Sequence, residues 1–137
     1  MSYVEHLAPF LRKTPFHEPI AALMHGQGWS RWMGFQSPAV FASEQAEYFA
    51  IRHGASVFDI SPLIKYAIRG REAARFVDFL VTRGISKLRP QHAAYTAWCE
   101  DDGRMIEEGT LFRLGESDFL LNAARHQLHW LGEAAYR

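Results

Sequence analysis

One tight-turn signal constrains the fold of this chain more than any other part of its sequence. The segment Asp-Asp-Gly at 101–103 separates two strand-like apolar runs, 93–99 and 105–114, and an Asp-Gly pair tolerates the positive φ of a short hairpin loop. Turn-forming residues at 115–118 separate the second run from a third run at 119–122. The sequence therefore predicts a meander of three antiparallel strands.

Helical patterns lie on both sides of this meander. Apolar residues recur at helical spacing over 72–83, and 43–53 and 126–135 are expected to form two further helices. The segments 57–60 and 64–68, on either side of a Ser-Pro turn, indicate two short strands. Strands mixed with helices in this way predict an α+β fold, in which an antiparallel sheet has helices packed on one face.

Individual residues indicate where the predicted helices begin and end. Ser43 is a favourable N-cap and Gly54 a favourable terminator for the helix over 43–53. Gly84 is expected to end the helix over 72–83. The last predicted helix is expected to bury one face, which carries Leu128, Leu131 and Ala135.

The first 42 residues contain prolines and glycines that interrupt any long helix. A short helix can start at Pro15, with Thr14 as its N-cap. Aromatic residues are frequent in this part of the chain: Trp29, Trp32, Phe35 and Phe41. We therefore expect an irregular, aromatic-rich arm over 1–42, which covers the core, and an α+β domain over 43–137.

Composition argues against several classes of function. The 137 residues are 48% hydrophobic, as in one globular domain, and 15 basic residues balance 15 acidic ones. A nucleic-acid or membrane-surface binder needs a basic surface, which this balance does not supply. Cys99 is the one cysteine, so no internal disulfide is expected, and the absence of a signal-peptide pattern or a membrane-length apolar run suggests a reducing, cytoplasmic setting. The seven histidines form no metal-binding pattern.

Two adjacent acids, Glu107 and Glu108, lie within the second strand of the predicted meander. Neighbours on a strand point to opposite faces, so one carboxylate is expected to face the core or a pocket and the other to face solvent. The alternative is that both lie at the rim of the sheet, one of them in a salt bridge. Gly109 follows directly and indicates a bulge or a close approach to the strand.

Tyr95 and Asn122 lie on the other two strands of the meander. A tyrosine ring and an asparagine amide could together hold a flat heterocycle with amide-like edges. The alternative is core packing for Tyr95 and a turn or helix-cap role for Asn122. Two other polar residues have structural interpretations: Asp59 is expected to stabilise the turn that follows it, and Cys99 to be a small buried hydrophobe.

In their order and spacing, these residues resemble the N-terminal part of the glycine-cleavage T-protein family. These are tetrahydrofolate-dependent aminomethyltransferases, with folate-dependent demethylase relatives. The resemblance runs from about Lys13 to Leu131. It is carried by R-K-T-P-F-H-E, by V-F-D-I-S, by Y-T-A-W-C-E-D-D-G-R-M-I-E-E-G-T-L-F-R-L-G and by L-L-N-A-A.

The resemblance implies roles for particular residues. The essential carboxylate of the family, usually an Asp, falls on Glu108, and the folate contacts fall on Tyr95 and Asn122. Glu107 is expected to be a third folate-binding residue. Glu108 would then orient the N5 atom of tetrahydrofolate and stabilise positive charge on the one-carbon donor. Pro62 stands with Leu63 where glycine-cleavage members usually have His-Met, which favours the demethylase side of the family.

The implied function is transfer of an aminomethyl or methyl unit from an amine or methylated donor to tetrahydrofolate. Family members are roughly two to three times longer and have three domains around a folate channel, so the part over 43–137 would be an incomplete folate-binding domain. We therefore expect a fragment, a truncated product or one part of a split enzyme, to which a second chain could supply the missing domains. The alternative is a non-catalytic module that binds folate or a partner subunit.

Overall fold

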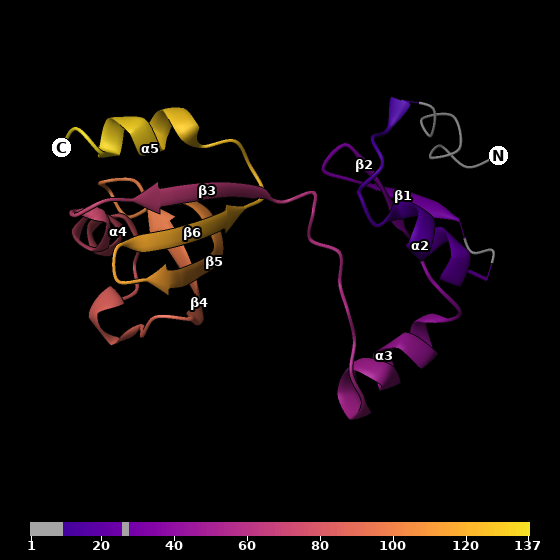
Figure 1. Cartoon of the computed structure of the whole chain (residues 1–137). Coiled ribbons are helices and arrows are strands. Elements are labelled where there is room, and N and C mark those ends of the chain that lie inside the picture. Colours follow the sequence, from indigo (N-terminus) through magenta and orange to yellow (C-terminus); the bar gives the residue numbers. More distant parts are fainter. Residues whose placement is uncertain (1–9, 26–27) are drawn as a thin grey trace. The chain divides into compact units, whose positions relative to one another are not determined.

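The computed structural model describes residues 10–25 and 28–137. The chain divides into two compact units, residues 1–62 and residues 63–137 (Figure 1). The division into an arm over 1–42 and a domain over 43–137 stays a prediction. Among the described residues, none of the helices has the length and apolar character that crossing a bilayer requires.

The first unit contains a short helix, α2 (His17–Leu23). It begins after the Thr14-Pro15 pair, where the Thr14 hydroxyl accepts a hydrogen bond from the Phe16 N–H at 3.3 Å. The Thr14 carbonyl accepts another from the His17 N–H at 3.1 Å. The N-cap residue of α2 is Phe16 and the helix has no side-chain cap, so the expected N-cap role of Thr14 is wrong. Thr14 instead stabilises the turn that precedes the helix.

A β-hairpin follows, made of β1 (Trp29–Trp32) and β2 (Phe35–Pro38). Its two-residue loop places Met33 at φ 53° and Gly34 at φ 79°, the left-handed conformation that such a loop requires. The expectation of an irregular course is therefore wrong for these residues. The hairpin was missed because the first loop residue is Met, which rarely adopts this conformation, and not Asn, Asp or Gly.

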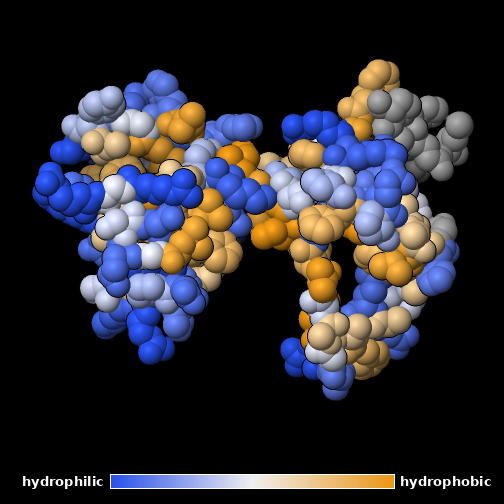
Figure 2. Space-filling model, viewed as in Figure 1, coloured by the Kyte–Doolittle hydropathy of each residue, from blue (hydrophilic) through white to orange (hydrophobic). Residues whose placement is uncertain are grey.

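Helix α3 (Glu44–His53) has the predicted bounds and caps. The Ser43 hydroxyl accepts a hydrogen bond from the Ala46 N–H at 3.1 Å, and Gly54 ends the helix. Hydrophobic residues reach the surface along α3 (Figure 2). The large exposed ones are Tyr48, Phe49 and Ile51.

The segment 57–60 is not a strand, contrary to expectation. Val57 is fully exposed and Phe58 is largely exposed, so the apolar residues that suggested a strand are not buried in a sheet. Asp59 does have the expected turn role, because its carboxylate accepts a hydrogen bond from the Ser61 N–H at 2.9 Å. An apolar run alone therefore did not define a strand here.

The second unit is built on a four-stranded antiparallel sheet in the order β3-β6-β5-β4 (Figure 1). The strands are β3 (Ile64–Arg69), β4 (His92–Cys99), β5 (Met105–Gly115) and β6 (Asp118–Ala123). Strands β4, β5 and β6 form the predicted meander, and β3 pairs with β6 at the far edge. The predicted α+β fold class is confirmed.

Helix α4 (Ala73–Leu80) is shorter than the predicted 72–83. Past Leu80 the chain pairs with the sheet, since the Thr82 N–H donates to the Ala97 carbonyl at 2.9 Å. The Asp78 carboxylate then accepts from the Ile85 N–H at 2.7 Å, at the start of the 3₁₀ helix η2 (Ile85–Lys87). Long-range contacts, and not Gly84, therefore end the helix.

Helix α5 (Leu128–Ala134) buries Leu131 as predicted, but not the other two residues of the predicted face. Leu131 and Ala134 are buried, whereas Leu128 is 70% exposed and Ala135 is exposed. The helix begins two residues later than predicted, and its buried residues follow an i, i+3 spacing.

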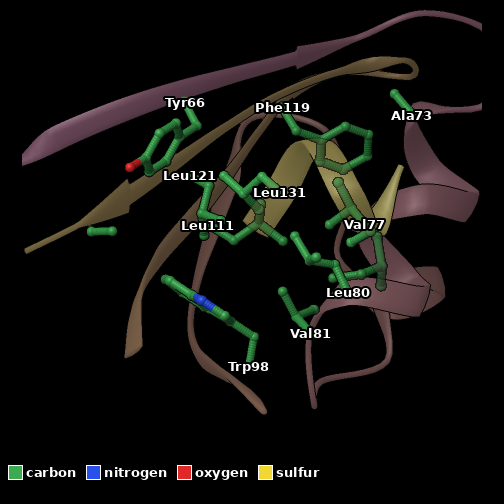
Figure 3. Packing of buried hydrophobic residues seen from close by; sticks show 13 residues of the cluster. Tyr66, Ala73, Val77, Leu80, Val81, Trp98, Leu111, Phe119, Leu121 and Leu131 are labelled. Atoms are coloured by element: carbon green, nitrogen blue, oxygen red, sulfur yellow. The ribbon is translucent and has the colours of Figure 1, made fainter. Parts of the chain in front are cut away.

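The core of the second unit lies between the helices and one face of the sheet. Figure 3 shows side chains of α4 and α5 pointing toward side chains of the strands. The helices contribute Val77, Leu80 and Leu131, and the strands Tyr66, Trp98, Leu111, Phe119 and Leu121. We call this side of the sheet the core face and the opposite side the second face.

Candidate functional site

The strand register brings three of the predicted site residues onto the second face of the sheet. Four residues lie directly opposite one another in a row across the four strands: Tyr95, Thr110, Asn122 and Lys65. Glu108 lies two residues before Thr110 on β5, so its side chain is on the same face. Tyr95, Glu108 and Asn122 therefore share this face, with Glu108 on the central strand diagonal to both of the others.

Tyr95 and Glu108 interact diagonally across β4 and β5. The pKa of Tyr95 is raised above its usual value, first by hydrogen bonding to the Glu108 carboxylate. Partial desolvation and the negative charges of Glu108 and Glu107 add to the effect. The Tyr95 ring is itself 60% exposed, so an aromatic face and a carboxylate are presented together.

Glu108→Gln is expected to lower the pKa of Tyr95 toward its ordinary value. A raised pKa means that the phenol keeps its proton to higher pH, because the neighbouring carboxylate disfavours the phenolate. Near-ultraviolet absorbance followed against pH measures this titration, and subtraction of the Tyr95→Phe spectrum isolates Tyr95 from the other tyrosines. Glu100→Gln, at the end of β4, is the control. An unchanged Tyr95 midpoint in Glu108→Gln would contradict the interaction.

Asn122 is buried in the middle of the sheet, between β3 and β5. It is 3% exposed, and its side-chain Oδ1 has no hydrogen-bond partner among the described residues. Such an unpaired buried polar atom costs about 1–3 kcal/mol. The alternative role as a helix cap is wrong, because α5 is preceded by Gln127 and has no side-chain cap. Asn122 is thus a buried acceptor available to a ligand's donor.

Glu107 points to the core face, opposite Trp98 and away from Tyr95 and Asn122. Its side chain is only 10% exposed, and its Oε2 lies 3.8 Å from Nε of Arg125. The expectation that the two acids face opposite sides is therefore met, with Glu107 as the inward one and Glu108 exposed. A direct contact between Glu107 and folate stays a prediction.

Gly109 explains how closely two of the strands approach. A Cβ atom at this position would lie 1.9 Å from the Asn122 carbonyl oxygen and 3.4 Å from the Trp98 ring. The glycine therefore allows close approach of the β6 backbone. The irregularities of register lie elsewhere, at Trp98/Cys99 and at Arg113/Gly115, so no bulge occurs at Gly109.

Sequence reasoning missed two polar residues of the row, Thr110 and Lys65. Thr110 lies directly between Tyr95 and Asn122, and Lys65 donates a hydrogen bond to the Leu63 carbonyl at 2.7 Å. A two-residue alternation from Glu108 would have found Thr110, whereas Lys65 required knowledge of the β3–β6 pairing.

Other candidate centres are weaker. A groove of about 960 Å³ between β3 and α5 reaches Lys65 but not Tyr95 or Glu108. Cys99 is half-buried, and not the fully buried hydrophobe expected. Within residues 10–25 and 28–137, no group of three or more His, Cys, Asp or Glu side chains is arranged to hold a metal ion.

Comparisons with known proteins show the family to which the chain belongs. The family model described as the GCVT N-terminal domain matches residues 16–136. An aminomethyltransferase of Geobacillus kaustophilus is 34% identical over 116 residues, which are 83% of this chain and 31% of that protein. One from Rubrobacter xylanophilus is 34% identical over 118 residues, which are 85% of this chain and 31% of that protein.

A solved structure shares the fold. The glycine cleavage system aminomethyltransferase T of Bartonella henselae matches with a TM-score of 0.76 and 21% identity, over 92% of this chain and 36% of that one. The chain therefore spans about a third of the length of these relatives. The family model covers nearly the whole chain, and the family expected from the sequence motifs is confirmed. This chain belongs to the GCVT N-terminal domain family.

Proposed function

We propose that this chain is the folate-facing part of a tetrahydrofolate-dependent one-carbon transferase. The full assembly would move an aminomethyl or methyl unit from an amine or methylated donor to tetrahydrofolate. The observation that supports this most directly is the common face of Tyr95, Glu108 and Asn122. Because the chain spans about a third of its relatives, transfer is proposed for this unit together with the remaining domains, on a longer chain or on a second chain.

The chemistry of the second face fits a pterin ring. Asn122 offers a buried, unpartnered acceptor, which suits an N–H on the edge of the ring. Tyr95 offers an exposed aromatic surface on β4, on the other side of β5 from Asn122, which suits the flat body of the ring. An unpaired polar group in the free protein that a ligand satisfies is a source of both affinity and specificity.

Glu108 is the residue proposed to act on the reacting atoms. Tetrahydrofolate supplies N5, a nucleophilic amine that takes up the one-carbon unit. A carboxylate beside that amine can hold its proton and stabilise positive charge that develops on the donor. Glu108 is exposed on the same face as Asn122 and contacts Tyr95, so it is available for that part. Its extra methylene, relative to the Asp usual in the family, would carry the carboxylate further from the strand.

Calorimetric titration with 5-formyl-tetrahydrofolate tests the proposal on the chain itself. We expect saturable binding that Tyr95→Ala and Asn122→Ala each weaken by about tenfold or more, which is roughly 1.4 kcal/mol. Tyr136→Ala is the matched control, because Tyr136 is almost fully exposed outside the sheet. Glu108→Gln is expected to retain binding, since its proposed part lies in the transfer step.

A cooperative melt of each variant must accompany the titration. A well-folded chain that binds no reduced folate would argue against a pterin site on this face. Equal binding by the wild type, Tyr95→Ala and Asn122→Ala would place the ligand elsewhere.

A further inference from the structure

We infer that Glu107 is a positioning residue, which holds the backbone of Glu108 from the core face of the sheet, and that it is not the direct folate contact predicted from the sequence. The consequence for folate chemistry rests on the proposed function. The positioning itself rests only on contacts within the second unit.

Glu107 and Glu108 lie on β5 just where its pairing with β6 ends. Strand β5 pairs with β6 only from Gly109 onward, opposite Ala123, so Glu108 is the first residue beyond that ladder. At this point the Glu107 Oε1 accepts a hydrogen bond from the Glu108 N–H at 3.2 Å. The side chain of one acid therefore fixes the peptide that carries the other.

Arg125 connects Glu107 to the chain beyond β6. The Arg125 Nε lies 3.8 Å from Glu107 Oε2, and the Arg125 carbonyl accepts a hydrogen bond from the Tyr66 hydroxyl at 3.1 Å. Tyr66 belongs to β3 and Glu107 to β5, so these contacts link both strands to the segment that follows β6. Glu107 therefore holds β5 to this segment at a point where the residue pairs between β5 and β6 have already ended.

The burial of the Glu107 side chain also supports its positioning role. Its Oε2 is buried without a hydrogen-bond partner among the described residues, and so is the indole Nε1 of Trp98, which lies directly opposite. A buried carboxylate that is not fully satisfied destabilises the fold. Burial also restricts the side chain to few rotamers, so the Oε1 that meets Glu108 is held in place. A reacting carboxylate benefits from such support, because a misplacement of about 1 Å can lower a rate by about two orders of magnitude.

Amide hydrogen exchange at Glu108, read by NMR, tests the inference directly. In Glu107→Ala, we expect exchange of the Glu108 amide to accelerate by about tenfold or more relative to the amides of β6. Glu107→Gln keeps a side-chain oxygen acceptor and should retain much of the protection. Arg125→Gln, at a mostly exposed side chain, should accelerate exchange less than Glu107→Ala. Glu100→Ala, an acid of the same hairpin, is the control.

The same variants are titrated with 5-formyl-tetrahydrofolate. Because the proposed contact is indirect, Glu107→Ala should weaken binding less than Asn122→Ala does.

If the wild type binds no folate, the proposed function fails, while the exchange data still decide whether Glu107 positions Glu108. Unchanged Glu108 exchange in both Glu107→Ala and Arg125→Gln would overturn the inference. So would a loss of folate binding in Glu107→Ala as large as in Asn122→Ala with exchange unchanged, because Glu107 would then be a direct contact. If Glu107→Ala does not fold, Glu107→Gln and Arg125→Gln decide: no acceleration in either overturns the inference.

Discussion

Gly109→Ala is expected to destabilise the second unit by about 3 kcal/mol or more. The added Cβ would lie 1.9 Å from the Asn122 carbonyl oxygen, a backbone atom of the adjacent inner strand. Neither strand can move away without breaking its other ladder, because β5 lies between β4 and β6, and β6 between β5 and β3. The backbone at Gly109 is not left-handed, so the effect comes from space alone.

The free energy of unfolding, measured in denaturant, checks this expectation. Gly132→Ala is the matched control, since a Cβ there meets no atom within 4 Å and Gly132 lies inside α5. That change should be neutral or stabilise by up to about 1 kcal/mol through helix propensity. Equal denaturant midpoints for the two variants would show that β5 and β6 can separate to admit a methyl group. The folate-facing residues would then lie on a more adaptable sheet than the register implies.

Local turn chemistry made much of the second unit predictable. The Asp-Asp-Gly turn at 101–103 fixes the hairpin, with Gly103 at φ 86° and the Asp102 carboxylate accepting from the Arg104 N–H. Once the turn is known, short-range pairing of β4, β5 and β6 follows from the strand lengths. The caps of α3 were predictable for the same reason, since Ser43 acts on a group three residues away.

Long-range contacts explain what the sequence did not predict. The end of α4 depends on a bond between Thr82 and Ala97, which are 15 residues apart. The pairing of β3 with β6 joins segments far apart in the sequence, as in Lys65 with Asn122, which are 57 residues apart. The segment 57–60 has strand-like residues but lies outside the sheet. Secondary-structure propensity and hydrophobic periodicity depend on residues close together in the sequence. They do not specify which distant segments pair with each other.

The candidate site was predictable in type but not in arrangement. Strand alternation alone required Glu107 and Glu108 to face opposite sides. It could not say which acid faces the helices, because that depends on where α4 and α5 pack. Nor could it say that Asn122 would be buried with an unpartnered oxygen, since its burial needs β3 on one side and β5 on the other.

Asn122→Leu is expected to stabilise the chain by about 1 kcal/mol and to weaken reduced-folate binding by at least about tenfold. Leucine has the same number of side-chain heavy atoms and the same branching as asparagine, so it can occupy this buried position without an unpaired oxygen. The acceptor proposed for the pterin edge would be lost at the same time. Stability and function would then respond in opposite directions, as they do where a binding group is held at the expense of the fold.

Thr96→Val is the matched control for this pair of measurements. Thr96 is also buried, but it lies on the core face, and its hydroxyl donates to the Ala97 carbonyl at 3.3 Å. Its replacement should therefore lose a hydrogen bond, lower the free energy of unfolding by up to about 1 kcal/mol and leave folate binding unchanged. Denaturant unfolding and calorimetric titration of both variants separate the two effects. If Asn122→Leu destabilised the chain, the amide would have partners in the free protein. If that variant bound folate as the wild type does, Asn122 would be a structural residue of the sheet and not the acceptor that the pterin needs.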